Sequence, residues 1–269
     1  MLLSAGSHPM GPVPADKTIG EFLGHDGADR FTLGRELHGA FGGLFGGVLA
    51  AAALVASRPL APGRVPAALD CHFVRGVPAG TLRAVASVLH AGRTLAVVNV
   101  DLLDERERLG TRATVTLVDP VGLRPLAHAG VAARVPWPGH VDGATWRAPE
   151  GVEAPIIATL APRAPVIGDM GIVTSVRVPW DGDGSSAEAC CLAADMCVGA
   201  PVGGAFPGQW VPHPNPDLSL RFAGHVTGRD IAAAGRLERI AGGVALVAIE
   251  VRSGDDVVAV GASCSLLLA

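Results

Sequence analysis

The feature that most constrains the fold of this 269-residue chain is an internal repetition. Two stretches rich in small residues, 39–56 and 185–198, are each followed by four segments whose composition is typical of β-strands. Within these segments, identical residues recur 149 positions apart: Leu69 and Leu218, Phe73 and Phe222, Ala96 and Ala245, Ala113 and Ala262, and Leu117 and Leu266. The repetition predicts a tandem duplication in which each copy has one strand, near residues 30–33 or at 172–178, then a central helix and four antiparallel strands.

The expected strands lie at residues 68–74, 81–90, 94–104 and 109–118 in the first copy, and at 218–222, 230–240, 244–252 and 257–267 in the second. We therefore divide the chain into an N-terminal repeat at 15–120, a connector at 121–165 and a C-terminal repeat at 166–269. The connector is rich in Pro, Gly and Ala, and we expect one short helix in it near residues 155–160. The fold class is α+β, with an antiparallel sheet wrapped around a central helix in each repeat.

Residues 39–56 carry no charge over 18 positions, a length at which a membrane span has to be considered. Ala and Gly are only weakly lipophilic, however, and no Trp or Tyr anchors flank the stretch. A helix that is apolar all round also suits the centre of a folded domain. We expect such a helix here, with the early glycines Gly39, Gly42 and Gly43 shaping its start.

The second stretch, residues 185–198, contains one carboxylate at a position where an apolar residue would be expected. Glu188 falls in the first turn of the expected helix, where a negative charge suits the helix dipole. Asp195 instead lies in an otherwise small and apolar run, where an unpaired buried carboxylate would cost several kcal/mol. Asp195 is therefore either a structural residue with hydrogen-bond partners in the core or a group whose charge or basicity is used in a cleft.

Composition argues against nucleic-acid and membrane partners. The net charge is −4 and Lys17 is the only lysine, so no basic tract is present to neutralise a phosphate backbone or an anionic surface. The five cysteines are odd in number and lack paired CxxC spacing, which favours free thiols in a reducing cytoplasm. We expect no metal, because the adjacent Cys190 and Cys191 would point to different faces of a helix, and no cofactor. The first residues lack the basic and apolar regions of a signal peptide.

A duplicated helix wrapped by an antiparallel sheet resembles the double hotdog acyl-CoA thioesterases, the TesB-like group. The likeness rests on the sequence Phe41-Gly42-Gly43 at the first helix, on His72-Phe73-Val74-Arg75 in the following strand, and on the lone Asp195 of the second helix. It spans roughly residues 29–118 and 172–268. The resemblance implies a tandem hotdog fold and hydrolysis of an acyl-CoA to a free acid and coenzyme A.

The same resemblance implies a catalytic set. In that family the helix Asp acts with a Thr or Ser on the next strand and a Gln on the last strand to activate water against the thioester carbon. Asp195 matches the Asp, while the other two positions fall at Asn215 and Ser263, which depart from the usual residues. Both side chains can still hydrogen-bond a water molecule.

The chemistry also has a physical basis in the residues. Thioester hydrolysis needs a base near the water and donors where the carbonyl oxygen becomes negative. A carboxylate whose pKa is raised by apolar neighbours suits the first task. Backbone N–H groups at a helix start suit the second, and Gly42 and Gly43 would let a substrate approach closely. We expect the first helix's start to face Asp195, and one site per chain because the first helix has no carboxylate.

Two further residues are candidates for substrate binding. His38 could touch substrate or could instead cap and pack the start of the helix. Arg75 could bind a phosphate of coenzyme A or could be a solvated residue at a strand end.

We therefore predict an acyl-CoA thioesterase of lipid metabolism, acting as a monomer or as a homo-oligomer paired through sheet edges. Two alternatives stay open: an acyl-CoA-binding hotdog protein that has lost efficient catalysis, and a hotdog hydratase or dehydratase. The latter is disfavoured because residues 214–217 lack the Asp-x-Asn-Pro pattern usual in hotdog hydratases.

Overall fold

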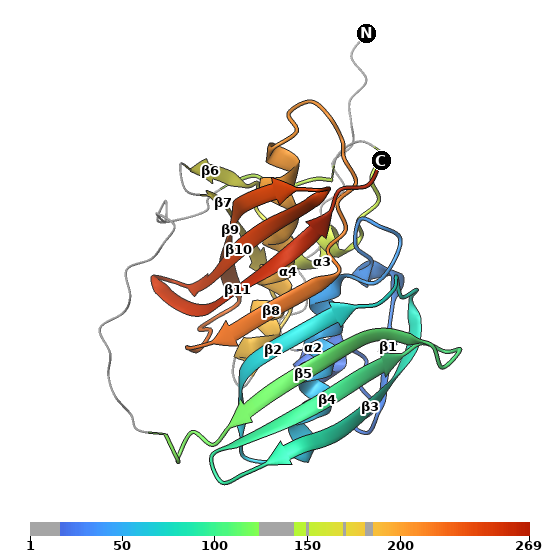
Figure 1. Cartoon of the computed structure of the whole chain (residues 1–269), viewed down its shortest axis with the longest axis vertical. Coiled ribbons are helices and arrows are strands. Elements are labelled where there is room, and N and C mark those ends of the chain that lie inside the picture. Colours follow the sequence, from blue (N-terminus) through green and yellow to red (C-terminus); the bar gives the residue numbers. More distant parts are fainter. Residues whose placement is uncertain (1–16, 124–142, 149–150, 169–170, 181–184) are drawn as a thin grey trace.

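A computed structural model of the chain describes residues 17–123, 143–148, 151–168, 171–180 and 185–269. These residues form one continuous antiparallel sheet of 11 strands, in the order β1-β3-β4-β5-β2-β8-β11-β10-β9-β7-β6 (Figure 1). The two long helices lie on the same side of the sheet (Figure 1). The duplicated helix and antiparallel sheet predicted from the repetition are thus present, and they form the α+β double hotdog that the family resemblance implies.

Each repeat follows the predicted order of one long helix and then four strands. The first contains α1 (Ile19–Phe22), β1 (Arg30–Leu33), η1 (Arg35–Leu37), α2 (Gly46–Ser57), η2 (Arg58–Leu60), β2 (Val65–Phe73), β3 (Gly80–Ala91), β4 (Leu95–Leu103) and β5 (Leu109–Val118). The second contains β6 (Val166–Gly168), β7 (Gly171–Arg177), α4 (Ser186–Gly204), β8 (Asp217–Phe222), β9 (Asp230–Ala241), β10 (Val244–Ser253) and β11 (Asp256–Leu266).

In the connector, the short helix α3 (Ile156–Leu160) lies where it was expected. Much of the rest of the connector, including residues 124–142, falls outside the described residues. The bounds of the two repeats and of the connector stay predictions.

The repeats join through strands β2 and β8. Asp70 of β2 pairs with Ser219 of β8, and these two residues are themselves 149 positions apart. Pairing runs outward from this point in both directions, as a two-fold relation between the halves requires. Arg221 strengthens the seam, because its Nη1 donates to Asp70 Oδ1 at 3.0 Å. The duplication read from the sequence is therefore built into the register of the sheet.

Helix α2 begins seven residues later than expected, at Gly46 and not at Gly39. The residues before it form a loop held by backbone hydrogen bonds: Gly39 N–H donates to Gly43 O at 2.9 Å and Leu44 N–H to Val77 O at 2.7 Å. Once the helix begins, almost all of it is buried, which explains why the stretch is apolar all round. Within the described residues, no helix combines the length and hydropathy needed to cross a bilayer.

Helices α2 and α4 pack directly against each other. The start of α2 lies beside the middle of α4, since a Cβ added to Gly47 would stand 2.7 Å from the carbonyl oxygen of Cys191. The end of α2 lies beside the first turn of α4, where Arg58 forms an ion pair with Glu188. The two helices therefore run in opposite directions. This arrangement brings the first turn of α2 to the carboxylate of Asp195.

Candidate active site

Asp195 is a buried residue of α4, with 7% of its surface exposed, and both of its carboxylate oxygens have partners. Asn215 Nδ2 donates to Oδ1 at 2.7 Å, and the backbone N–H of Gly47 donates to Oδ2 at 2.8 Å. Burial raises the pKa of Asp195 to about 6, while the hydrogen bonds from Asn215, Gly47 and Gly46 lower it. At neutral pH the group is a carboxylate with raised basicity.

The N-terminus of α2 carries a partial positive charge that faces the negative carboxylate of Asp195. The first N–H groups of a helix have no partner within the helix and carry the positive end of its dipole. In α2 these groups belong to Gly46 and Gly47, which confirms that the first helix's start faces Asp195. A side chain at Gly46 would stand 3.0 Å from Asp195 Oδ2 and 2.7 Å from the ring of Phe73. Only glycine gives this close approach without displacing a neighbour.

The glycines proposed for this role from the sequence, Gly42 and Gly43, lie in the loop before the helix. Gly42 has a φ of +75°, a backbone conformation that favours glycine in a turn. A Cβ on Gly43 would stand 3.2 Å from the backbone N and O of Val77. Both glycines therefore shape the entry to the helix from the preceding loop, and their role in letting a substrate approach the helix start stays a prediction.

Of the two predicted helpers, the structure brings Asn215 to Asp195 and places Ser263 one contact further away. Ser263 lies on β11, and its Oγ donates to the backbone oxygen of Asp217 at 2.7 Å. Asn215 Nδ2 also approaches that oxygen, at 3.4 Å. Ser263 is thus connected to Asn215 through the Asp217 carbonyl, and its hydroxyl makes no direct hydrogen bond to Asp195.

The side chain of His38 supports the loop before α2. Its Nε2 accepts a hydrogen bond from the backbone N–H of Ala79 at 3.0 Å, and its backbone oxygen accepts from Ile156 N–H. The ring thus makes a structural contact of the kind weighed against substrate contact, and its role in substrate binding stays a prediction. Arg75 is exposed just beyond β2, and among the described residues its guanidinium has no hydrogen-bond or ion-pair partner.

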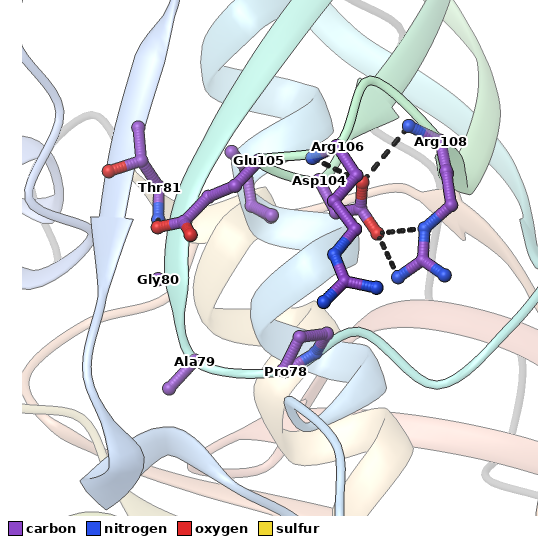
Figure 2. Close-up of a pocket in the computed structure, with 9 residues that line it drawn as sticks. Pro78, Ala79, Gly80, Thr81, Asp104, Glu105, Arg106 and Arg108 are labelled. Atoms are coloured by element: carbon purple, nitrogen blue, oxygen red, sulfur yellow. Dashed lines mark hydrogen bonds and ion pairs between the residues drawn. The ribbon is translucent and has the colours of Figure 1, made fainter.

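A pocket of about 240 Å³ lies between the β2–β3 connection and the β4–β5 turn (Figure 2). Its lining includes Asp104, Glu105, Arg106 and Arg108, and Asp104 is bound to Arg108 by side-chain hydrogen bonds. Neither Asp195 nor Asn215 lines it. The pocket is therefore distinct from the buried carboxylate, although Ala79, one of its lining residues, is the donor to His38.

All five cysteines are free thiols, and burial raises the pKa of Cys190 to about 12. Within the described part of the chain, no group of three or more His, Cys, Asp or Glu side chains could hold a metal ion.

Sequence reasoning missed the roles of Gly46 and Gly47, of Phe73 and of Asp217. The sequence does contain a signal for the role of Gly46 and Gly47. Gly46-Gly47 is the last glycine pair before the run at residues 48–57, which contains no glycine, as expected of a helix body. The contacts of Phe73 and Asp217 depend on strand pairing, because Phe73 N–H donates to Pro216 O across the seam and Asp217 contacts residues of β11.

Three solved structures with this fold place the chain in a structural class. A hot dog fold protein of unknown function from Alicyclobacillus acidocaldarius has a TM-score of 0.76 and 20% identity, covering 93% of this chain and 98% of that one. A putative thioesterase from Novosphingobium aromaticivorans has a TM-score of 0.72 and 21% identity, covering 97% and 100%. The tesB protein of Mycobacterium avium subs paratuberculosis has a TM-score of 0.69 and 17% identity, covering 94% and 100%. At these identities the likeness establishes the double hotdog fold.

The first repeat is also similar in sequence to a known family. Residues 35–118 match the family model of the acyl-CoA thioesterase N-terminal domain. This match and the fold together confirm the resemblance to the TesB-like thioesterases. No curated protein matches the chain.

Proposed function

We propose that the protein hydrolyses acyl-CoA thioesters with water activated by Asp195. The observation that carries the proposal is the paired carboxylate: Asp195 is buried, its pKa is raised to about 6, and both oxygens are held by fixed donors. Such a group is ionised at neutral pH and still basic enough to take a proton from water. The acyl-CoA thioesterase domain match of the first repeat supports the same reaction.

In the proposed reaction, a water molecule gives a proton to Asp195 as its oxygen bonds to the thioester carbon. The tetrahedral intermediate then breaks the carbon–sulfur bond, and coenzyme A leaves as a thiolate that takes the proton back from Asp195. The products are a carboxylic acid and coenzyme A. Asn215 holds the carboxylate in one orientation, and Ser263 supports Asn215 through the Asp217 carbonyl. The first-turn N–H groups of α2 hold the Asp195 carboxylate, and the positive end of the α2 dipole favours the negative charge that develops on the thioester oxygen beside it.

Arg75 is the proposed contact for a phosphate of coenzyme A. It is exposed, lies two residues after Phe73, and forms no hydrogen bond or ion pair with the described residues. The ring of Phe73 stands against Gly46 at the start of α2, so β2 connects this guanidinium to the site. We place the reaction in lipid metabolism and in the cytoplasm, where five free thiols are compatible with a reducing environment.

Assembly through sheet edges stays a prediction. The edges are β1, with four residues, and β6, with three. Short edge strands leave few unpaired backbone groups for a second chain, so a monomer is the form we expect first.

The test is hydrolysis of acetyl-, butyryl-, octanoyl-, decanoyl- and palmitoyl-CoA by the purified protein, followed by chromatography of the coenzyme A released. We expect Asp195→Asn to abolish release. Asp230→Asn, which changes an exposed carboxylate on β9, serves as the matched control and should retain activity.

Turnover that survives Asp195→Asn would refute the mechanism. Thermal stabilisation of the wild type by acyl-CoA without release of coenzyme A would instead support a binding protein.

A further inference from the structure

Three aromatic side chains, Phe41, Trp210 and His213, form a cluster that joins residues of the two repeats. The ring of His213 contacts both Phe41 and Trp210, with centroid separations of 6.2 and 5.7 Å. These separations lie within the usual range for aromatic pairs. His213 is buried, whereas Phe41 and Trp210 are each 48% exposed. Two large aromatic side chains are therefore presented to solvent, one from each repeat.

The cluster lies along the face of α4 that carries Asp195. Gly199 and Gly203 follow Asp195 at intervals of four residues, which places all three on one face of the helix. The ring of His213 stands over these glycines, since a Cβ on Gly199 would be 3.2 Å from Nε2 and one on Gly203 would be 3.8 Å from Cε1. At a rise of about 1.5 Å per residue, the ring lies roughly 6–12 Å along the helix from Asp195.

The same segments also connect the cluster to the catalytic groups along the chain. Phe41 lies five residues before Gly46, whose N–H faces Asp195, and Trp210 lies five residues before Asn215. The aromatic rings and the catalytic groups therefore sit on the same two segments. An acyl group bound with its thioester at Asp195 would have the cluster within reach only if its chain is long.

The charge of the two segments indicates which end of an acyl-CoA fits here. Residues 37–47 and 196–216 contain no Asp, Glu, Lys or Arg. Coenzyme A carries several phosphate charges, and these segments offer no guanidinium or ammonium group to pair with them. An uncharged hydrocarbon chain suits the exposed rings of Phe41 and Trp210, because it removes apolar surface from water on both sides.

We propose that Phe41 and Trp210, supported by His213, bind the distal part of the acyl chain and select long-chain over short-chain acyl-CoA. The inference rests on the proposed function for the position of the thioester. It adds the class of substrate, a long-chain acyl-CoA. An acetyl group is too short to reach the cluster, and it should be bound equally well with or without these rings.

Binding is tested in the Asp195→Asn background, so that the result does not depend on turnover. Calorimetry with coenzyme A, acetyl-CoA and decanoyl-CoA is compared before and after adding Trp210→Ala, and separately Phe41→Ala in case the first variant does not fold. We expect each substitution to weaken decanoyl-CoA binding roughly tenfold, the loss of one partly buried aromatic contact. Binding of coenzyme A and acetyl-CoA should be unchanged. Leu89→Ala, at another exposed apolar residue, on β3, is the control and should affect none of the three ligands.

An equal loss for all three ligands would overturn the proposal, because the cluster would then contact the coenzyme A part. An unchanged affinity for decanoyl-CoA in both variants would overturn it as well. So would a change from dimer to monomer on Trp210→Ala in sedimentation velocity, which would assign the rings to a contact between copies. If the wild type hydrolyses none of the acyl-CoAs but the chain-length effect on binding is present, the reaction is wrong and the acyl site stands.

Discussion

Arg58 and Glu188 join the two central helices through two parallel hydrogen bonds, Nε to Oε1 and Nη2 to Oε2, each 2.8 Å long. The Glu188 side chain is fully buried and that of Arg58 is 31% exposed. Burial raises the pKa of Glu188, and the charge of Arg58 opposes that rise. The pair therefore neutralises a carboxylate at the point where the end of α2 meets the start of α4.

Removing the guanidinium should destabilise the protein strongly. Arg58→Ala leaves Glu188 buried without its partner, and we expect a loss of about 3 kcal/mol in the free energy of unfolding. Arg177→Ala is the control, because Arg177 and Asp230 form an exposed pair worth less than about 1 kcal/mol. Urea denaturation of the two variants measures both losses in the free energy of unfolding. Equal losses in the two variants would contradict the structural role of the buried pair.

The rate of hydrolysis should follow the ionisation of Asp195. Only the carboxylate can accept a proton from water, so kcat/KM should rise with pH and reach half its maximum near pH 6. Asn215→Ala removes a donor that lowers the pKa of Asp195, so the midpoint should move to higher pH. Asn99→Ala, which removes a hydrogen bond to Thr114 instead, should leave the midpoint in place. A profile that is flat from pH 5 to pH 8, a range that brackets this midpoint, would exclude Asp195 as the base.

The raised pKa also predicts how stability depends on pH. The folded protein holds the Asp195 proton up to about pH 6, whereas the unfolded chain releases it near the ordinary value of 3.8. The folded state therefore binds more protons between these values, and the wild type should lose stability relative to Asp195→Asn as the pH rises through this window. The expected change is roughly 3 kcal/mol. Urea denaturation of both proteins at several pH values measures it, and a difference that grows in favour of the wild type would contradict it.

Gly47 should be irreplaceable by alanine. A Cβ there would lie 2.7 Å from the Cys191 carbonyl oxygen and 3.0 Å from the Leu192 Cα, which are backbone atoms of α4. Gly47→Ala should cost about 2 kcal/mol despite the higher helix propensity of alanine, because the helices must separate. Gly76→Ala meets no atom within 4 Å and should be nearly neutral. Thermal unfolding of the two variants compares them, and similar midpoints would show that the helices can adjust.

The thiols should be almost inert in the folded protein. Cys71, Cys190, Cys191 and Cys197 are buried, and only Cys264 is partly accessible. Burial and a hydrogen bond to Asp217 raise the pKa of Cys264 to about 11, so little thiolate exists at neutral pH. A thiol reagent should label all five residues in guanidinium chloride and at most one, slowly, without it. Rapid labelling of several thiols in the native protein would mean that the core opens readily.

The sequence allowed the architecture and the central carboxylate to be predicted, each for an identifiable reason. A duplication leaves identical residues at a fixed spacing, and the same spacing of 149 residues separates Asp70 and Ser219, which the structure pairs at the seam. Asp195 was found because a charge within an apolar run must have a partner or a use. Asn215 was found from the family resemblance, and its contact with Asp195 gives that position a physical role.

Other parts of the site depend on contacts that composition does not encode. Five glycines precede the body of α2, and although the glycine-free run at residues 48–57 marks that body, composition does not show how the loop before it is held. The hydrogen bond from Leu44 to Val77, which decides the matter, joins residues of different elements. In the same way, Ser263 reaches Asn215 through Asp217 only because β11 pairs with β8.

The seam between β2 and β8 has a consequence for how the site could evolve. In an assembly of two identical hotdog chains, every substitution appears twice, so a helix cannot gain a carboxylate without its partner gaining one too. Covalent linkage of the halves removes this constraint. Here one helix supplies the carboxylate, and the other contributes only the amide groups of its first turn. The two halves therefore differ at this contact, and a substitution in one helix leaves the other helix unchanged.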